Sequence, residues 1–205
     1  MSQFYWRTLL GIIGGLSAVA QPLPNSESAA ALLGRMEARA AHVQDYTVTC
    51  EAEINGRTAR YKLYFKQPNL VRIDTDRGQV TVQPNGEIRG RLGHGLFGRI
   101  SRRLSRDDPR LRDGDGSPFW DATYAATLSR IQSHIRAGAD STASKTQDGL
   151  ELRVSAGQTV WRYAIDPETL FFREIHRVQG GRQVENTRYS ELRCDVGLES
   201  KLFEF

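Results

Sequence analysis

The chain has 205 residues, of which 39% are hydrophobic and 25% are charged. This composition is typical of a soluble globular protein of about one domain, and it excludes a disordered chain, a collagen and a protein with several membrane spans. Lys and Arg outnumber Asp and Glu by 28 to 24, which gives a formal net charge of +4. That excess is too small to indicate a class of partner.

The N-terminus has the pattern of a secretory signal peptide. An apolar run over residues 8–19 follows Arg7, and Ala18-Val19-Ala20 supplies the small residues of a cleavage site. The run is too short to span a bilayer comfortably, although the three aromatic residues at 4–6 would lengthen it if it stayed as an uncleaved anchor.

We therefore predict that residues 1–20 are a signal peptide cleaved after Ala20. Residues 21–205 are then expected to form a single domain of a periplasmic protein. No cysteine stands where an acylated lipoprotein would need one.

Cys50 and Cys194 are the two cysteines of the sequence. An even count in an exported protein is typical of a disulfide, which would close a long loop and stabilise the fold by about 4–5 kcal/mol in the chain-entropy model. Two buried free thiols are the alternative. A pair so far apart in the sequence has no metal-site spacing.

The first predicted elements are a helix and a hairpin. Leu33, Met36, Ala40 and Val43 recur at helical spacing behind Ser28, which is a suitable N-cap. Apolar and polar residues then alternate over residues 46–54 and 59–66, on either side of Asn55-Gly56. This dipeptide is the signature of a two-residue hairpin turn.

Shorter strands follow, separated by turn residues. They are predicted at Val71–Asp74, Val80–Gln83 and Glu87–Arg91. Strands so closely spaced indicate an antiparallel meander.

Between Gly90 and Gly116 the strand pattern stops. Residues 89–112 contain eight Arg against Asp107 and Asp108, a local charge of +6. A solvated loop is the commonest explanation, contact with anionic lipid headgroups is the second, and nucleic acid is a distant third. Export argues against nucleic acid, and the cluster lacks the interleaved aromatic residues of a base-stacking surface.

We predict contact with an anionic membrane surface at this loop, because apolar residues stand beside the cationic ones. The residues expected to make it are Phe97, Arg99, Arg102 and Arg103.

A second helix is predicted after Ser117-Pro118, a cap followed by proline at the first helical position. Tyr124, Leu128, Ile131 and Ile135 give this helix one apolar face up to Gly138. Residues 139–148 are expected to form a polar linker. The closing strands are predicted at Leu150–Val154, Trp161–Ile165, Leu170–Val178 and Gln183–Val196.

Two sequence motifs resemble ligand-binding sites, but the residues around them do not fit those sites. Residues 93–98 match the letters of a dinucleotide-binding fingerprint, but an Arg-dense segment broken by Pro109 follows in place of a helix. Asp113 begins a partial calcium-loop pattern that lacks the glycine at its sixth position and the glutamate at its twelfth, so we predict a turn. The four histidines lie singly. We therefore predict no enzyme, no cofactor and no metal.

Three segments resemble the LolA/LolB-like superfamily of periplasmic lipoprotein carriers. Residues 64–74 are similar to the corner of that superfamily in which a K-x-P-N motif joins two strands, and residues 198–205 are similar to its ending. Residues 90–109, up to the second helix, look like an uncharacterised branch known as a domain of unknown function. The resemblance covers nearly all of the chain after residue 20.

The resemblance implies an α+β fold: a strongly curved antiparallel sheet, or unclosed β-barrel, whose concave apolar face is covered by helices. The expected insertion into this domain is the Arg-rich loop and helix at about 92–138. The alternation of apolar residues along the strands and the two amphipathic helices fit this architecture.

The resemblance also implies a carrier that holds lipid or lipoprotein acyl chains in a cavity, as a monomer and without nucleic acid. For each residue the alternative is an ordinary place in the core. The residues expected to line the cavity are Met36, Tyr61, Leu63, Phe65, Val71, Ile73, Leu128, Ile131, Ile135, Trp161, Tyr163 and Ile165.

One departure concerns Gln67, which stands where the lipoprotein carrier has an arginine that helps to hold its closed state. Gating by the carrier's own mechanism is therefore not expected. The alternative function is a sensor or interaction domain similar to regulators that bind an anti-sigma factor in the periplasm. Those regulators have a second C-terminal domain, for which a chain ending at Phe205 leaves no room.

Overall fold

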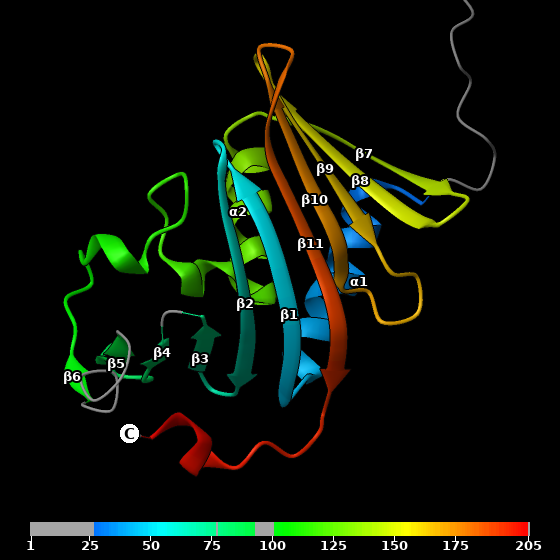
Figure 1. Cartoon of the computed structure of the whole chain (residues 1–205). Helices are drawn as coiled ribbons and strands as arrows, with labels where there is room; N and C mark the ends of the chain where they lie inside the picture. Colours follow the sequence, from blue (N-terminus) through cyan, green and yellow to red (C-terminus); the bar gives the residue numbers. More distant parts are fainter. Residues whose placement is uncertain (1–26, 77, 93–100, 205) are drawn as a thin grey trace, which may run out of the picture.

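The computed structural model describes residues 27–76, 78–92 and 101–204. The predicted signal peptide and the fingerprint-like segment at 93–98 lie outside these residues. The fold is α+β, as predicted: two helices and one antiparallel sheet of eleven strands that does not close into a barrel. Figure 1 shows both helices on the same face of the curved sheet.

The strands pair in the order β6-β5-β4-β3-β2-β1-β11-β10-β9-β8-β7. They are β1 (Asp45–Ile54), β2 (Arg57–Lys66), β3 (Leu70–Thr75), β4 (Gly78–Val82), β5 (Ile88–Leu92), β6 (Arg102–Arg103), β7 (Asp140–Thr146), β8 (Gly149–Ala156), β9 (Thr159–Ile165), β10 (Phe172–Gln179) and β11 (Arg182–Cys194). The first and last hairpins of the chain therefore meet at β1 and β11, near the middle of the sheet.

The hairpin of β1 and β2 forms as the sequence predicts. Asn55 and Gly56 connect the strands with φ of 51° and 75°, the left-handed values that a two-residue turn of this type requires. The register pairs Ile54 with Arg57 and continues without interruption to Asp45 and Lys66.

Helix α1 (Ala29–His42) begins behind Ser28, whose hydroxyl accepts a hydrogen bond from the backbone N–H of Ala31 at 3.2 Å. The N-cap predicted from the sequence is thus confirmed. Leu32, Leu33 and Met36 are buried on one face of the helix.

The start of the second helix differs from the prediction. A 3-10 helix spans Phe119–Ala122, and α2 (Tyr124–Arg136) begins only after Thr123. Extended backbone at Thr123 separates the two pieces, and the hydroxyl of Tyr46 on β1 accepts a hydrogen bond from the N–H of Tyr124 at 2.9 Å. The sheet supplies the partner that a local cap would have supplied.

The end of the second helix is as predicted: Gly138 follows it with φ of 93°.

Two segments predicted to lack strands contain them. Residues 139–148 contain the whole of β7, a polar strand at one edge of the sheet that pairs with β8 from Asp140 to Thr146. An exposed edge strand needs few apolar residues, so its sequence resembles a linker. Within the Arg-rich segment, Arg102 and Arg103 form the short strand β6 at the other edge.

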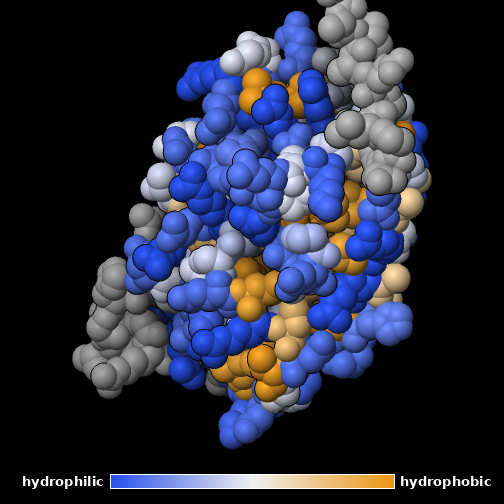
Figure 2. Space-filling view, turned by 90° about the vertical axis from the view of Figure 1, so that its right-hand side faces the viewer, coloured by the Kyte–Doolittle hydropathy of each residue, from blue (hydrophilic) through white to orange (hydrophobic). Residues whose placement is uncertain are grey.

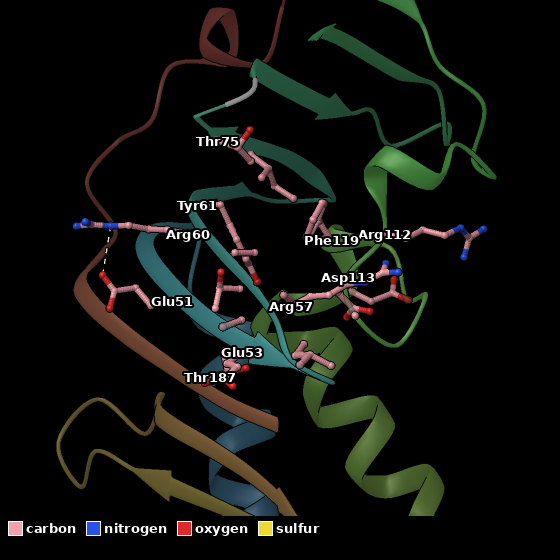
Figure 3. Close-up of a pocket in the computed structure, with 18 of the residues that line it drawn as sticks. Glu51, Glu53, Arg57, Arg60, Tyr61, Thr75, Arg112, Asp113, Phe119 and Thr187 are labelled. Carbon is pink, nitrogen blue, oxygen red and sulfur yellow. Dashed lines mark ion pairs between the residues drawn. The ribbon is translucent and has the colours of Figure 1, made fainter. Parts of the chain in front are cut away.

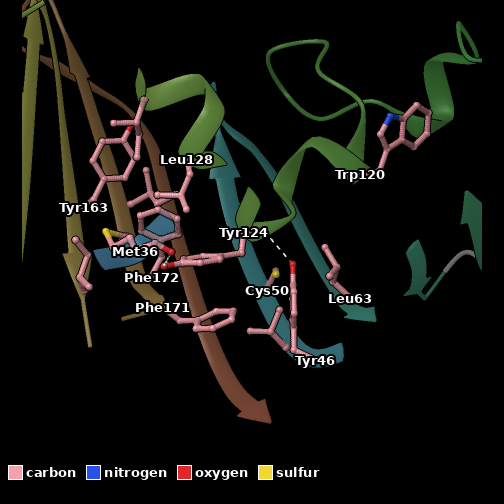
Figure 4. Close-up of a cluster of buried hydrophobic side chains, with 14 of the residues drawn as sticks. Met36, Tyr46, Cys50, Leu63, Trp120, Tyr124, Leu128, Tyr163, Phe171 and Phe172 are labelled. Carbon is pink, nitrogen blue, oxygen red and sulfur yellow. Dashed lines mark hydrogen bonds between the residues drawn. The ribbon is translucent and has the colours of Figure 1, made fainter. Parts of the chain in front are cut away.

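The main core lies between the concave face of the sheet and the helices (Figure 4). Tyr124 of α2 stacks on Phe171 with ring centroids 4.2 Å apart, and Phe172 contacts both Tyr124 and Tyr163. The helices contact the strands β7 and β8, whereas the 3-10 helix at Phe119–Ala122 contacts β3. The two halves of the sheet are therefore covered by different segments.

The C-terminal segment packs on the convex face. Lys66, Arg72 and Gln83, which alternate with core residues, donate hydrogen bonds to the carbonyls of Leu198, Leu202 and Phe203. Phe203 lies in the 3-10 helix Ser200–Phe203, is 1% exposed, and is separate from the main core cluster. The convex face thus has an anchor of its own.

Figure 2 views the molecule from the side on which β7 to β9 and α1 lie. Hydrophilic residues cover most of this side, and hydrophobic residues gather toward its lower part. Among the described residues, Val196 is the one large hydrophobic side chain that counts as exposed, at 47%. Neither helix in the described part of the chain has the length and hydropathy that crossing a bilayer would require.

Candidate functional site

A cleft opens on the concave face, between the hairpin end of β1 and β2 and the segment 109–122 (Figure 3). The hollow of which it is part has a volume of about 1500 Å³ and extends to solvent-facing residues of the same strands, such as Glu51 and Arg60. The floor of the cleft comes from β1, β2, β3, β4 and β11, its roof from residues 109–122, and Arg130 of α2 stands at one side. The register of the strands explains why space is left here.

Small side chains form the floor. Ala59, Ala52 and Thr187 lie side by side across β2, β1 and β11, because Ala52 pairs with Ala59 on one side and with Thr187 on the other. The same row continues into Ile175, Tyr163 and Leu152, which are large and buried. The sheet is therefore filled where α2 covers it and hollow where the three small residues meet.

The next inward-facing row, two residues along β1 from Ala52 and farther from the hairpin turn, consists of Tyr61, Cys50 and Tyr189. Burial raises the pKa of the Cys50 thiol to about 12 and raises the pKa values of both tyrosines further above their usual range. All three groups are therefore neutral at physiological pH, and they form an uncharged wall.

The row at the hairpin end is charged. It contains, across β2, β1, β11 and β10, Arg57, Ile54, Glu185 and Arg177. Arg177 Nε lies 3.5 Å from Glu185 Oε2, and the hydroxyl of Thr187 donates to Glu185 Oε1 at 3.2 Å. The cleft thus has an apolar floor and a charged rim.

Aromatic and aliphatic side chains form the roof. Leu111 and Trp120 are 2% and 8% exposed, and the ring of Phe119 lies 5.5 Å from that of Tyr61 across the cleft. In Figure 3, Phe119 and Tyr61 lie on one side of the strands, and the ion pair of Glu51 and Arg60 lies on the other.

The roof is attached to the hairpin turn at one end. The side-chain amide of Asn55 donates to Asp115 Oδ1 at 2.6 Å and to the carbonyl of Gly114 at 3.3 Å. A Cβ atom on Gly114 would lie 2.0 Å from the carbonyl oxygen of Ile54, so only glycine permits this approach. Asp115 also forms an ion pair with Arg177.

Two carboxyl groups at the rim are partly withdrawn from water. Burial raises the pKa of Asp113, although its Oδ1 accepts the N–H groups of Asp115 and Ser117 at 2.8 and 2.9 Å. These bonds make the turn that the sequence predicts here. Burial also raises the pKa of Glu185.

Most residues predicted to line an acyl cavity lie in the packed core. Nine of the twelve are buried: Met36, Tyr61, Leu63, Val71, Ile73, Leu128, Ile131, Tyr163 and Ile165. Phe65, Ile135 and Trp161 are partly buried against them. Only Tyr61 and Ile73 border the cleft, and Leu128 borders a shallow depression between α1 and α2. An acyl-binding role for the set stays a prediction.

The sequence did not predict the residues that form the floor and roof of the cleft. Ala52 and Ala59 carry no chemical signal, and their meeting with Thr187 depends on strands more than 120 positions apart in the sequence. The segment 109–122 was expected to belong to an Arg-rich loop and the start of a helix. Only the alternation in β1 and β2 indicated that Ala52 and Ala59 face inward.

The predicted membrane-contact residues fall into two groups. Phe97 and Arg99 lie outside the described residues. Arg102 and Arg103 are exposed in β6, and Arg103 stands directly opposite Arg89 of β5. A membrane contact stays a prediction.

The two cysteines are free. Cys194 pairs with Tyr46 in the register of β1 and β11, four residues along the strand from Cys50. At about 3.3 Å per residue this separation is roughly twice the reach of a disulfide. The predicted disulfide is therefore absent, and the structure has the alternative, two free thiols.

Gln67 contributes to the packing of α1. Its side-chain amide donates to the carbonyl of Val43 at 2.9 Å and to that of Ala41 at 3.2 Å. The residue that departs from the carrier's pattern thus ties the corner after β2 to the end of the helix.

Among the described residues, the acidic, histidine and cysteine side chains form no group that could hold a metal ion. The cleft can therefore offer apolar contacts, hydrogen bonds and charges from its own side chains.

No family model and no curated protein matches the sequence. Solved structures do match. An uncharacterized conserved protein from Thermus thermophilus is 10% identical with a TM-score of 0.51, over 85% of this chain and 91% of that chain. MucB is 13% identical with a TM-score of 0.51, over 84% of this chain and 62% of the MucB chain.

Another match is described as a protein of the LolA superfamily. A LolA superfamily protein from Nitrosomonas europaea is 9% identical with a TM-score of 0.39, over 84% of this chain and 97% of that chain. MucB from Pseudomonas aeruginosa has also been solved in complex with MucA. At these identities the likeness concerns the fold alone.

Proposed function

We propose that the protein is an exported, periplasmic binding protein that holds an acyl chain of a lipid or lipoprotein in the cleft, as a monomer and without enzymatic chemistry. The observation that carries the proposal is the floor of Ala52, Ala59 and Thr187 beneath an aromatic roof. A flexible chain fits such a floor because the three side chains are small and adjacent.

The size and lining of the cleft support this choice of ligand. The cleft is part of a hollow of about 1500 Å³, and small-molecule sites typically measure roughly 300–1000 Å³, so an acyl chain has room there. Each methylene group buried against the floor and roof contributes about 0.8 kcal/mol. Affinity would therefore grow with chain length.

Export rests on the sequence. The N-terminal pattern and the resemblance to periplasmic carriers both agree with a periplasmic location. Contact of Arg102 and Arg103 with an anionic membrane surface would bring the cleft to a membrane that donates or accepts the lipid.

The test is displacement of a fluorescent fatty acid from the purified protein, compared with the variant Ala59→Leu. The larger side chain occupies the floor, so we expect at least tenfold weaker binding of the probe. Native mass spectrometry of protein purified from the periplasm gives a second measurement, in which bound lipid appears as added mass.

The control is Ala143→Leu on β7, which lies in the same row of the concave face but outside the cleft. It should bind the probe as the unmodified protein does. Wild-type protein that carries no lipid and binds no probe would exclude the proposal.

A second candidate is an interaction domain that binds a regulatory protein, supported by the fold shared with MucB. The charged rim suits a polypeptide as well as a lipid. Native mass spectrometry separates the two, since a polypeptide partner adds several kilodaltons and is released by protease, whereas a lipid is extracted by organic solvent.

A further inference from the structure

The rim of the cleft contains two arginines with open guanidinium groups. Arg57 stands at the hairpin end of β2, beside Ile54, and Arg130 projects from the second turn of α2. Neither guanidinium forms a hydrogen bond or an ion pair with any of the described residues, although the charge of Arg130 lowers the pKa values of Asp113 and Glu185. Both are in the lining of the cleft.

The carboxylates at the same end are already engaged. Asp115 accepts from Asn55 and pairs with Arg177, and Asp113 accepts two backbone N–H groups. Glu185 accepts from Thr187 and lies near Arg177. Burial raises the pKa values of Asp113 and Glu185, and the positive charge of Arg130 acts against this rise in both groups.

The remaining arginine of this rim is engaged too. Arg112 donates to the carbonyl of Gly116 at 2.6 Å and lies 3.0 Å from Asp107. Arg57 and Arg130 are thus the cationic side chains at this end of the cleft whose guanidinium donors form no hydrogen bond or ion pair among the described residues, although the charge of Arg130 also acts on Asp113 and Glu185. Lys62, Arg60 and Arg188 of the same lining belong to the solvent-facing side of their strands.

We propose that the ligand of the cleft is an anionic amphiphile whose carboxylate or phosphate head binds between Arg57 and Arg130, while its chain lies on the floor of Ala52 and Ala59. This inference rests on the proposed function and names the chemistry of its ligand. A guanidinium recognises either head through paired N–H donors, so carboxylate and phosphate share the chemistry.

The floor and the two arginines are expected to recognise different parts of the ligand. The floor binds the chain whatever its head, and the two arginines add affinity only for an anionic head. Because both arginines are exposed to solvent, this added affinity should fall as salt concentration rises.

The experiment measures dissociation constants for four ligands of equal chain length: a fatty acid, a monoacyl phosphate lipid, a neutral monoacylglycerol and an alkyl ammonium. For the full mature protein we expect the two anionic ligands to bind at least tenfold more tightly than the neutral one, and the cationic ligand to bind most weakly. The fatty acid and the phosphate lipid together show which anionic head is preferred.

The decisive variants are Arg57→Gln and Arg130→Gln, alone and combined. Each should weaken binding of the anionic ligands about tenfold and leave the neutral ligand unchanged. Arg162→Gln on the convex face of β9 and Arg136→Gln in the last turn of α2 are matched controls outside the cleft, and they should change neither.

The outcomes distinguish this inference from the proposed function. Equal binding of anionic and neutral ligands, or a double variant that keeps the anionic preference, overturns the inference and leaves the carrier function standing. Failure of all four ligands to bind overturns both.

Discussion

At the scale of single residues, hydrogen bonds from the sheet decide where α2 begins. The hydroxyl of Tyr46 accepts the N–H of Tyr124 in a buried position, where no water can replace it. The first turn of α2 is thereby fixed to β1, and with it the side of the cleft that Arg130 occupies.

Removing that hydroxyl should be costly. Tyr46→Phe keeps the ring, which stacks on Phe65, but leaves the N–H of Tyr124 without a partner. We expect a loss of about 1–3 kcal/mol in the free energy of unfolding, measured by urea denaturation. Tyr64→Phe, whose ring lies on the convex face, is the control and should lose little; an equal loss in both variants would show that the bond contributes nothing specific.

Asp113 should make stability depend on pH. Burial raises its pKa in the folded state above the ordinary value of 3.8, so the folded protein holds this proton where the unfolded chain has released it. The contribution of Asp113 is therefore full below that ordinary value and is lost as pH rises through the folded pKa.

The variant Asp113→Asn removes this dependence and keeps the acceptor oxygen. The stability of the wild type relative to the variant should fall as pH rises from about 3 to about 7, as measured by urea unfolding at each pH. Asp140→Asn at the edge strand is the comparison. A constant difference across the range would contradict a raised pKa at Asp113.

At the scale of elements, the hairpin turn of β1 and β2 has two roles. Asn55 adopts the positive φ of the turn, and its side chain also binds the roof at Gly114 and Asp115. The turn that ends the floor of the cleft therefore holds the segment that covers it.

The variant Asn55→Gly separates these roles, because glycine keeps the turn geometry and lacks the amide. We expect faster hydrogen exchange at the N–H groups of residues 113–117 and a loss of about 1 kcal/mol in stability. Exchange in the hairpin of β8 and β9 should be unchanged. Uniform acceleration over both regions would indicate general destabilisation and not a released roof.

At the scale of the whole molecule, the two faces of one sheet are stabilised by different segments. Helices and the roof cover the concave face, and the C-terminal segment covers the convex face around Phe203. This second anchor is hydrogen-bonded to the ends and middle of neighbouring strands through Lys66 of β2, Arg72 of β3 and Gln83, which follows β4.

Phe203→Ala should therefore destabilise the whole protein although Phe203 lies outside the main core. Loss of a buried phenylalanine costs about 3–5 kcal/mol, and thermal denaturation measures it. Lys201→Ala in the same 3-10 helix, with an exposed side chain, should cost little. An equally small effect of both changes would show that the segment is not an anchor.

The local elements are largely determined by the sequence, because their causes lie within a few residues. Ser28 caps α1, Asn55-Gly56 makes the turn, and alternation sets the inward face of β1 and β2. Polar β7 and the late start of α2 escape such reasoning, since the first depends on its place at the edge and the second on Tyr46.

The cleft was decided by tertiary structure alone. The sequence by itself places Ala52 and Ala59 on inward positions and supplies an apolar face for each helix. Whether those small residues meet Thr187 or a larger neighbour depends on the register between β1 and β11. That register also keeps Cys50 and Cys194 apart. Pairing between strands so distant in the chain is fixed by the packing of the entire sheet, which no local pattern contains.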